Sequence, residues 1–278
     1  MSLTSKTLHV RRNGAVYYVT FPSFDRTGLV HHLYSTRRGG VSQGYRGPMN
    51  LGFSRGDDRE AVLENFRRIC YVSNICADNL VFANQVHGDR IVYVDQRDRG
   101  MGIFKPQELD GVDGLITDKP QVCLVEQFAD CVPLFFLDPQ KKVIGLAHAG
   151  WRGTVLEIGR KMVEKMVQEH GCKHKDILAG IGPSIGPCSF EVGPEVEAEF
   201  AKHFPQWLPF ITRPSAEHPE KNTIDLWRLN QLILLKAGLL PEHVTVTDVC
   251  TKCNPEYFHS HRHMGDQRGT QAAFLELI

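Results

Sequence analysis

Three short motifs contain residue types that can bind a metal ion or act as a nucleophile. His87 lies in NQVHG (residues 84–88), Cys131 in ADCVP (129–133) and His148 in AHAGWRG (147–153). Cysteine thiolate and neutral imidazole are preferred zinc ligands, and three protein ligands with one open position are typical of a catalytic zinc site. The motifs are compatible with such a site, and equally with an inert buried cysteine beside ordinary hydrogen-bonded histidines.

A cysteine nucleophile is the competing interpretation of these residues. It needs only Cys131 and one histidine as its base, whereas the metal site uses both His87 and His148. Trapping by iodoacetamide without any requirement for metal would indicate the nucleophile.

The predicted strands place these residues where functional groups usually lie. Apolar runs at 122–128, 132–137 and 143–148 are separated by short turns, which predicts antiparallel neighbours in one sheet. Cys131 lies between the first two runs, and His148 ends the third before a glycine-rich turn. Strand ends of this kind commonly present functional groups in open α/β sheets.

The remaining pattern predicts a mixed α/β fold. Apolar residues recur at helical spacing after Thr154 until Gly171, and a second helix is predicted from an N-cap at Asp225 to Gly238. Further predicted elements are strands at 16–21, 31–34, 81–82, 91–94, 244–249 and 272–277, a glycine-rich loop at 37–52 and a surface loop at 213–222. No linker divides the chain, so we expect a single catalytic domain over residues 1–278.

Composition excludes several classes of partner. Lys plus Arg and Asp plus Glu both number 32, so no excess charge attracts nucleic acid or an anionic membrane surface. Met1 to Arg12 contain no signal-peptide core, and no apolar run is long enough to cross a bilayer. The eight cysteines are irregularly spaced, which favours reduced thiols. We therefore expect a cytoplasmic protein that acts on a small molecule.

A second group of possible ligands lies near the C-terminus. Cys250 and Cys253 form a CxxC pair, followed by His259, His261 and His263. Only one CxxC is present, and the histidines alternate as HxH in a possible strand, unlike the HxxxH of zinc-finger helices. We expect this pair to bind no metal.

Two glycine-rich segments and two arginines could contact an anion. Segments 37–42 and 181–187 could offer backbone amides, although neither is a Walker A loop or a GxGxxG motif. Arg37 and Arg152 add planar donors suited to phosphate or carboxylate.

Taken together, eight motifs in a fixed order resemble the YfiH/YlmD family, also called the polyphenol oxidase or laccase domain family and the peptidoglycan editing factor family. They are STRRGGVS (35–42), NLG (50–52), GDD (56–58), NQVHG (84–88), DGLIT (113–117), ADCVP (129–133), HAGWRG (148–153) and IGPSIG (181–186). The resemblance spans the chain from Ser35 to the C-terminus. It implies an α/β (α+β) layered sandwich with mixed β-sheets, related to the catalytic domain of cytotoxic necrotising factor.

The resemblance also implies site residues. The metal ligands of the family fall on His87, Cys131 and His148, and its TRxGG arginine falls on Arg37. Relatives often end with a TGR-like motif where this chain has RGT (268–270), so the resemblance assigns no role to Arg268, although SHR (260–262) matches. The metal is expected to be zinc, with copper possible because copper outcompetes zinc at many nitrogen and sulfur sites.

Activities attributed to relatives are purine nucleoside and methylthioadenosine phosphorolysis, adenosine deamination, copper-dependent phenol oxidation and correction of misincorporated serine in peptidoglycan precursors. A multicopper oxidase needs about ten histidine and cysteine ligands, and only one three-ligand cluster can be assembled here. Zinc with these ligands lowers the pKa of bound water towards neutrality, which suits attack on C6 of adenine. Phosphorolysis requires a phosphate site.

We therefore expect a zinc-dependent enzyme that phosphorolyses adenosine, inosine, guanosine and methylthioadenosine and deaminates adenosine. Its expected substrate contacts are Arg37, Asn50, Gln85, Asp130 and Arg152, with Arg37 on the phosphate and Asp130 or His87 moving a proton. The alternatives are an amidase or hydrolase that edits peptidoglycan precursors through Cys131, a copper-dependent phenol oxidase, and a non-enzymatic metal-binding accessory protein.

Overall fold

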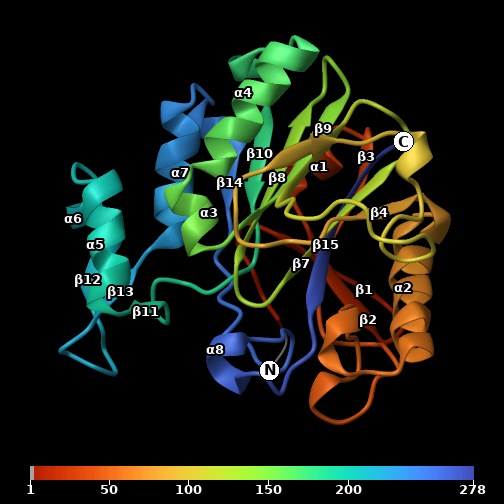
Figure 1. Cartoon of the computed structure of the whole chain (residues 1–278), viewed down its shortest axis with the longest axis horizontal. Helices are drawn as coiled ribbons and strands as arrows, with labels where there is room; N and C mark the ends of the chain where they lie inside the picture. Colours follow the sequence, from red (N-terminus) through yellow and green to blue (C-terminus); the bar gives the residue numbers. More distant parts are fainter. Residues whose placement is uncertain (1–2) are drawn as a thin grey trace.

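Two six-stranded mixed sheets form the centre of the computed structural model, which describes residues 3–278 (Figure 1). The first sheet has the order β1 (His9–Asn13), β2 (Val16–Thr20), β3 (Val30–Ser35), β15 (Gln271–Leu277), β7 (Cys123–Phe128) and β4 (Leu80–Phe82). The second has the order β14 (Val244–Val246), β10 (Leu178–Ile181), β8 (Val132–Asp138), β9 (Val143–Ala149), β6 (Gly114–Thr117) and β5 (Ile91–Tyr93). Residues 1 and 2, which belong to the predicted domain and to the N-terminal segment expected to lack a signal peptide, lie outside the described residues.

The two sheets pack face to face over an apolar core. Leu124 and Leu275 of the first sheet belong to the same buried cluster as Phe135 and Leu146 of the second. Every residue of β8, β9 and β15 is buried, so both faces of these strands are covered. Strands covered on both faces have continuous apolar runs in place of an alternating pattern, as the sequence of β8 and β9 shows.

Helices cover the outer faces of the two sheets. Helix α2 (Arg59–Ser73) packs its Phe66 in one cluster with Phe274 of the first sheet. Helices α4 (Ile158–His170) and α7 (Leu226–Lys236) cover the second sheet, where Met162 and Leu234 share a cluster with Phe136. Figure 1 shows α2 and the α4–α7 pair on opposite sides of the sheets. The expected layered α/β fold with mixed sheets is confirmed.

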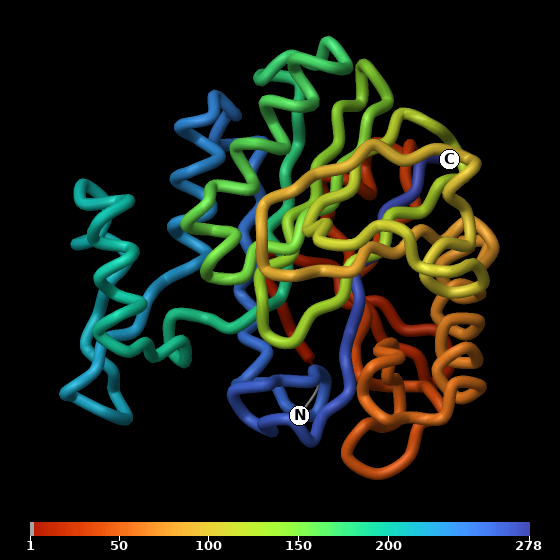
Figure 2. The backbone as a smooth tube through the Cα atoms, in the orientation of Figure 1, coloured from red at the N-terminus to blue at the C-terminus, as the bar shows by residue number. Residues whose placement is uncertain are grey.

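A smaller extension follows β10. It contains a three-stranded sheet of β11 (Glu191–Val192), β13 (Asn222–Ile224) and β12 (Thr212–Pro214), with helices α5 (Pro194–His203) and α6 (Leu208–Ile211). Figure 2 shows this cyan segment leaving the main body and returning to it. The ends of the predicted surface loop at 213–222 therefore lie in β12 and β13. The single-domain organisation stays a prediction.

One predicted strand pairing is wrong. Strands β7 and β8 were expected to be antiparallel neighbours, but β7 pairs with β15 and β4, and β8 pairs with β9 and β10. Residues 129–131 carry the chain from one sheet to the other. A short connection between two apolar runs is compatible with a hairpin and with a crossover between stacked sheets, so its length does not distinguish them. The antiparallel pairing of β8 with β9 is confirmed.

The helices also differ in part from the prediction. The helix expected after Thr154 is two helices, α3 (Trp151–Val155) and α4, separated at Glu157, whose φ is 56°. Helix α2 was not predicted, and neither were the short helices α1 (Pro22–Asp25) and α8 (His261–Met264). The predicted N-cap is confirmed, since the Asp225 side chain accepts a hydrogen bond from the backbone of Arg228. No helix among the described residues is long and apolar enough to span a membrane.

Candidate functional site

The two histidines and the cysteine singled out in the sequence converge on one place. His87 lies in the loop after β4, Cys131 lies between β7 and β8, and His148 lies near the end of β9. Their nearest ring nitrogens and the sulfur all lie within 4.8 Å of one another. The crossover between the sheets therefore brings Cys131 beside two histidines that are far from each other in the sequence.

Asp113 orients His148. The buried His148 Nδ1 lies 2.8 Å from Asp113 Oδ1, and the carboxylate can only accept this hydrogen bond. The proton is thereby held on Nδ1, which leaves Nε2 available towards Cys131. A carboxylate behind a histidine in this way is the usual partner of a metal-binding imidazole.

The same carboxylate shapes the loop of His87. Asp113 accepts hydrogen bonds from the backbone amides of Val86, His87 and Gly88, at 3.1, 2.9 and 2.8 Å. His87 has a φ of 64°, in the left-handed region that few residues other than glycine adopt. Three successive amides directed at one carboxylate offset the cost of this conformation. The sequence analysis named Asp113 only as part of the DGLIT motif and did not predict that it positions both histidines.

The charges of Cys131 and His148 are coupled. Burial opposes ionisation of the Cys131 thiol, but the nearby His148 charge and hydrogen bonds from both histidines lower its pKa to about 6. Burial likewise opposes a charged His148, but the Cys131 thiolate and Asp113 raise its pKa to about 10. Without a metal, these opposite pKa shifts favour a thiolate beside an imidazolium at neutral pH. A metal-binding thiolate is already favoured, while His148 must release a proton to become a ligand.

The absence of a side chain at Gly150 allows His87 and Cys131 to approach each other closely. A Cβ atom added at Gly150 would lie 2.9 Å from His87 Cδ2 and 3.1 Å from Cys131 Sγ. The backbone of Gly150 has a φ of −62°, so the reason for glycine here is the close approach and not the conformation.

Two cavities meet at the cluster, and both are lined by His87, Ala129, Cys131 and Arg268. The first has a volume of about 190 Å³ and is mainly polar; it is also lined by Ser54, Arg55, Ala83, Asn84, Gln85, Gln127, Phe128, His148 and Thr270. The second has a volume of about 320 Å³ and is more apolar; it is also lined by Asp130, Trp151, Ile185, Phe190, Leu226, His261 and Arg262. A ligand that extends through both cavities would pass the cluster.

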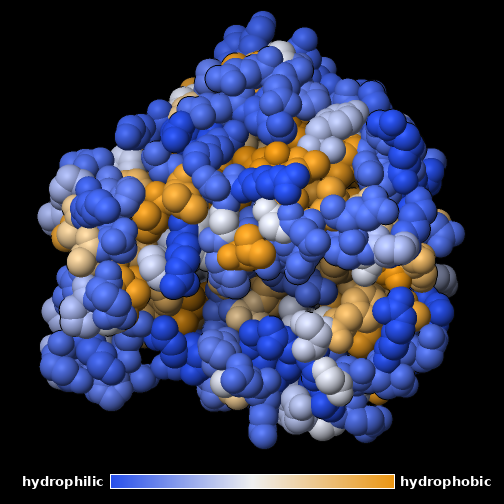
Figure 3. Space-filling model, viewed as in Figure 1, coloured by the Kyte–Doolittle hydropathy of each residue, from blue (hydrophilic) through white to orange (hydrophobic). Residues whose placement is uncertain are grey.

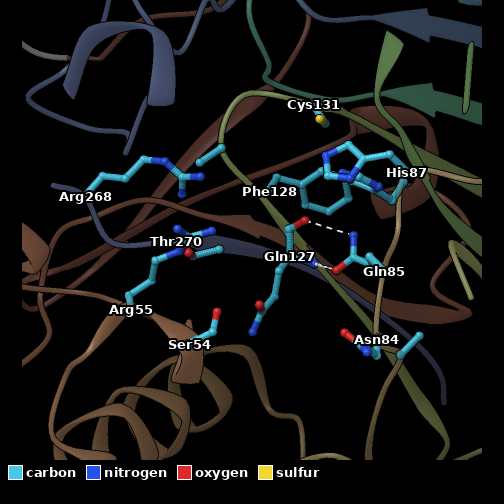
Figure 4. A pocket seen from close by; sticks show the side chains of 13 residues that line it. Ser54, Arg55, Asn84, Gln85, His87, Gln127, Phe128, Cys131, Arg268 and Thr270 are labelled. Carbon is cyan, nitrogen blue, oxygen red and sulfur yellow. Dashed lines mark hydrogen bonds between the residues drawn. The ribbon is translucent and has the colours of Figure 1, made fainter. Parts of the chain in front are cut away.

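Two arginines dominate one side of the first cavity. Figure 4 shows Arg55 and Arg268 reaching into it from the same side, beside Thr270. Among the described residues, neither Nε atom has a hydrogen-bond partner, although both are buried. Burial and the nearby Arg55 lower the pKa of Arg268 to about 10. A buried and a partly buried arginine, each with a free Nε donor, indicate an anion site.

Of the substrate contacts expected from the sequence, two line these cavities. Gln85 lines the first, where Figure 4 shows its amide hydrogen-bonded to the backbone of Gln127. Asp130 lines the second, but its carboxylate accepts hydrogen bonds from Thr251 Oγ1, Ser260 Oγ and the Arg262 amide. Both side chains hold the walls of the site together, and their polar groups are already engaged.

The other three expected contacts line neither cavity. The Arg37 guanidinium donates hydrogen bonds to the carbonyls of Gly47 and Pro255 and so connects the two loops that contain them. Asn50 is fully buried and hydrogen-bonds within its own turn and to the Thr270 amide. The exposed Arg152 stacks on Trp151, with its guanidinium carbon 4.2 Å from the ring centroid. The geometry therefore favours Arg55 and Arg268 over Arg37 as anion ligands. The sequence did not indicate this, because the RGT segment that contains Arg268 differs from the family motif.

Comparison with known proteins identifies the family. A family described as multi-copper polyphenol oxidoreductase laccase matches residues 31–278. Purine nucleoside phosphorylase YlmD from Bacillus subtilis is 37% identical over 243 residues, which cover 87% of this chain and 86% of that protein. The chain belongs to the YfiH/YlmD family. A second relative, adenosine deaminase RL5 from an unknown prokaryotic organism, is 34% identical over 85% of this chain and 90% of its own.

The YfiH/YlmD fold is also found in solved structures. The crystal structure of the hypothetical protein YfiH from Bacillus licheniformis matches with a TM-score of 0.89 and 31% identity, over 97% of this chain and 99% of that one. The matched region of the YfiH/YlmD family includes both cavities and the cluster between them. Two imidazoles and a thiolate form a donor set that fits a metal ion, in agreement with the metal in the description of the family.

The neighbours of Cys250 and Cys253 in the structure differ from those expected from the sequence. Cys188, which sequence analysis did not consider, joins them in a second group of possible ligands, and Glu191, Glu217 and His218 form a third. The histidines expected in a strand near this pair lie elsewhere: His259 is buried, and His261 and His263 lie in α8. The alternation of these histidines therefore does not bear on metal binding at Cys250 and Cys253.

Proposed function

We propose that this protein is a zinc-dependent purine nucleoside enzyme that catalyses phosphorolysis and deaminates adenosine. Relatives named purine nucleoside phosphorylase and adenosine deaminase support a purine nucleoside-processing function in the family. One observation supports the proposal for this chain most directly. Arg55 and Arg268, whose Nε atoms have no hydrogen-bond partner, line the same cavity as the cluster of His87, Cys131 and His148.

The two cavities suit the two parts of such a reaction. Orthophosphate carries the charge and acceptor oxygens that Arg55 and Arg268 would bind in the first cavity. Trp151, Ile185 and Phe190 give the second cavity apolar and aromatic walls suited to a purine ring. The sugar would then lie between them, beside the cluster.

His87, Cys131 and His148 would hold the zinc ion, which supplies Lewis acidity and makes a water molecule nucleophilic at neutral pH. Asp113 keeps His148 oriented and maintains the loop of His87. Arg55 and Arg268 would orient the phosphate oxygen towards C1′ of the ribose as the bond from C1′ to the purine nitrogen breaks.

The departing purine needs a proton, and the two residues expected to supply it are otherwise engaged. Asp130 already accepts three hydrogen bonds, and His87 would be a metal ligand. His261 lines the second cavity, and its Nδ1 lies 3.2 Å from the Gly265 carbonyl, which orients the ring. We therefore propose that His261, in place of Asp130 or His87, donates the proton to the departing purine.

The experiment compares Arg268→Lys with Arg37→Lys in two assays. Arg268→Lys is expected to raise the KM for phosphate in phosphorolysis by about tenfold or more, or roughly 1.4 kcal/mol, because lysine cannot reproduce the planar donors. Adenosine deamination uses water and should change less. Arg37→Lys is the matched control, since its guanidinium is occupied by backbone carbonyls. An Arg37→Lys effect on phosphate KM equal to that of Arg268→Lys would overturn the assignment of the anion site.

A second candidate function rests on the same cluster. Cys131, His148 and Asp113 have the order of a nucleophile, its base and the carboxylate that orients the base, and the pKa of Cys131 is lowered to about 6. This arrangement favours a cysteine-dependent amidase or hydrolase. Iodoacetamide should inactivate such an enzyme in the presence of a chelator, whereas substrate turnover that is lost with the metal would support the zinc enzyme.

A further inference from the structure

Three cysteines that are not part of the His87–Cys131–His148 cluster form a second group of possible metal ligands. Cys188 lies in the loop between β10 and β11, and Cys250 and Cys253 lie in the turn after β14. Their three sulfur atoms lie within 4.8 Å of one another, and the sulfurs of Cys188 and Cys253 are 3.5 Å apart. Cys188 and Cys253 are exposed, so an ion can reach them, while Cys250 is buried.

This spacing matches a metal site better than a redox pair. Tetrahedral zinc with a zinc–sulfur distance of about 2.3 Å separates its sulfur ligands by roughly 3.8 Å. A disulfide joins only two sulfurs, about 2.05 Å apart, whereas three sulfurs share this place. Ser189 Oγ lies 3.4 Å from the sulfurs of both Cys188 and Cys253, close enough to be the fourth ligand that a closed structural site needs.

The surrounding backbone holds the sulfurs together. The Gly186 amide donates to Cys250 Sγ at 3.2 Å, which favours a thiolate there. The Thr251 amide donates to the Ser184 carbonyl at 2.9 Å, so the two cysteine-bearing segments are joined beside the cluster. An ion would find most of its ligands already positioned, which reduces the entropy cost of binding.

We propose that Cys188, Cys250 and Cys253 form a structural zinc site that fixes the wall of the second cavity. Soft thiolate ligands select zinc over magnesium, calcium and manganese. Arg262 donates to the carbonyls of Ser189 and Glu191, and its guanidinium lies over Phe190. Phe190 and Arg262 both line the second cavity, so zinc on Cys188 would hold the loop that carries this wall.

The experiment isolates this site in the full-length His87→Ala/His148→Ala variant. After dialysis against a weak chelator, this variant is expected to retain about one zinc per chain, and addition of Cys188→Ser or Cys253→Ser should remove it. Cys76→Ser is the matched control, because Cys76 is also an exposed free cysteine but lies outside the cluster. Far-UV circular dichroism checks that each variant is folded.

A second measurement does not depend on the serine variants folding. Cobalt added to the metal-free His87→Ala/His148→Ala protein should give the intense near-ultraviolet absorption of thiolate-to-cobalt charge transfer. The proposal is overturned if that folded protein binds no zinc and gives no such absorption, or if its zinc survives both serine substitutions. Intact mass showing a Cys188–Cys253 disulfide in place of zinc would also overturn it. Because His87 and His148 are absent throughout, failure here would leave the proposed nucleoside chemistry untouched.

Discussion

Single residues around the cluster do more than supply ligands. One carboxylate, Asp113, fixes the ring of His148 and the backbone of His87, and Gly150 leaves just enough room for His87 and Cys131 to meet. These neighbours set the geometry on which any metal or thiolate chemistry would depend.

Gly150→Ala is therefore expected to disturb the cluster without removing a ligand. The added methyl group would lie within 3.1 Å of Cys131 Sγ and closer still to His87, so the side chains must separate. We expect zinc affinity to fall by about tenfold or more, measured by competition with a chromophoric chelator.

Gly159→Ala provides the control for simple overpacking. Its added methyl group would lie 3.1 Å from Leu134 and 3.2 Å from Leu234, in the core and away from the cluster. This variant should lose stability by about 1–3 kcal/mol and keep its zinc affinity. Equal zinc affinity in both variants would mean that Gly150 does not control the site.

At the scale of elements, the short crossover between β7 and β8 connects several parts of the site. Residues 129–131 leave the first sheet and enter the second, and Asp130 at their centre accepts hydrogen bonds from Thr251, Ser260 and Arg262. The crossover, the turn after β14 and the start of α8 are therefore held together by one buried carboxylate.

Asp130→Ala should weaken this junction and lower the free energy of unfolding. Hydrogen bonds to a charged group contribute about 1.5–3 kcal/mol, so we expect a loss of about 3 kcal/mol in urea denaturation when all three donors lose their acceptor. Asp78→Ala, at an exposed position, should change stability by less than about 0.5 kcal/mol. A loss for Asp130→Ala as small as that of the control would show that the junction is held by other contacts.

Elements were predictable from the sequence where the signal is local. The cap at Asp225, the periodic residues of α7 and the hairpin of β8 and β9 all depend on neighbours in the chain. Helix α2 also carries such a signal, since Val62, Phe66 and Ile69 share its buried face, and it was overlooked. The assignment of β7 to another sheet depends on packing between distant segments, which periodicity does not report.

The same distinction applies to the site. His87, Cys131 and His148 were identified because their residue types and family motifs are distinctive. Arg268 was not identified, because its suitability as an anion ligand depends on its burial beside Arg55, which lies more than two hundred positions earlier in the sequence. The phosphate was assigned to Arg37 because this arginine belongs to a family motif. In the structure its guanidinium instead holds two loops together.

At the scale of the whole molecule, the stacked sheets also bury ionisable groups that line neither cavity of the site. Figure 3 shows a mainly hydrophilic face on which hydrophobic areas are divided by polar side chains. Inside, His32 is buried and accepts a hydrogen bond from the Phe21 amide at 2.8 Å, which requires a neutral ring nitrogen. Burial lowers the pKa of His32 to about 4, although Asp25 acts in the opposite direction.

Stability should therefore fall as the pH is lowered. Between pH 6.5 and about 4, the unfolded state protonates His32 while the folded state does not, so acid favours unfolding. His32 alone should lower the free energy of unfolding by about 2 kcal/mol between pH 7 and pH 5. His32→Gln keeps a hydrogen-bond acceptor but cannot titrate, so the difference between the two pH values should shrink by about that amount in urea denaturation.

His203→Gln is the control for replacing a histidine by glutamine, at an exposed position at the end of α5. An unchanged pH dependence in His32→Gln would show that His32 takes up a proton in the folded protein.

The central claim is that His87, Cys131 and His148 hold the zinc on which nucleoside turnover depends. The direct measurement is phosphate-dependent release of the purine base from inosine and adenosine, with zinc content determined on the same samples. We expect release by the zinc-loaded protein, loss after chelation, and recovery when zinc is returned. His87→Ala, Cys131→Ala and His148→Ala should each lose turnover together with about one zinc per chain, while any zinc on the three-cysteine site remains. Full zinc in all three variants would contradict the ligand assignment, and a zinc-loaded protein that turns over neither nucleoside would contradict the proposed function.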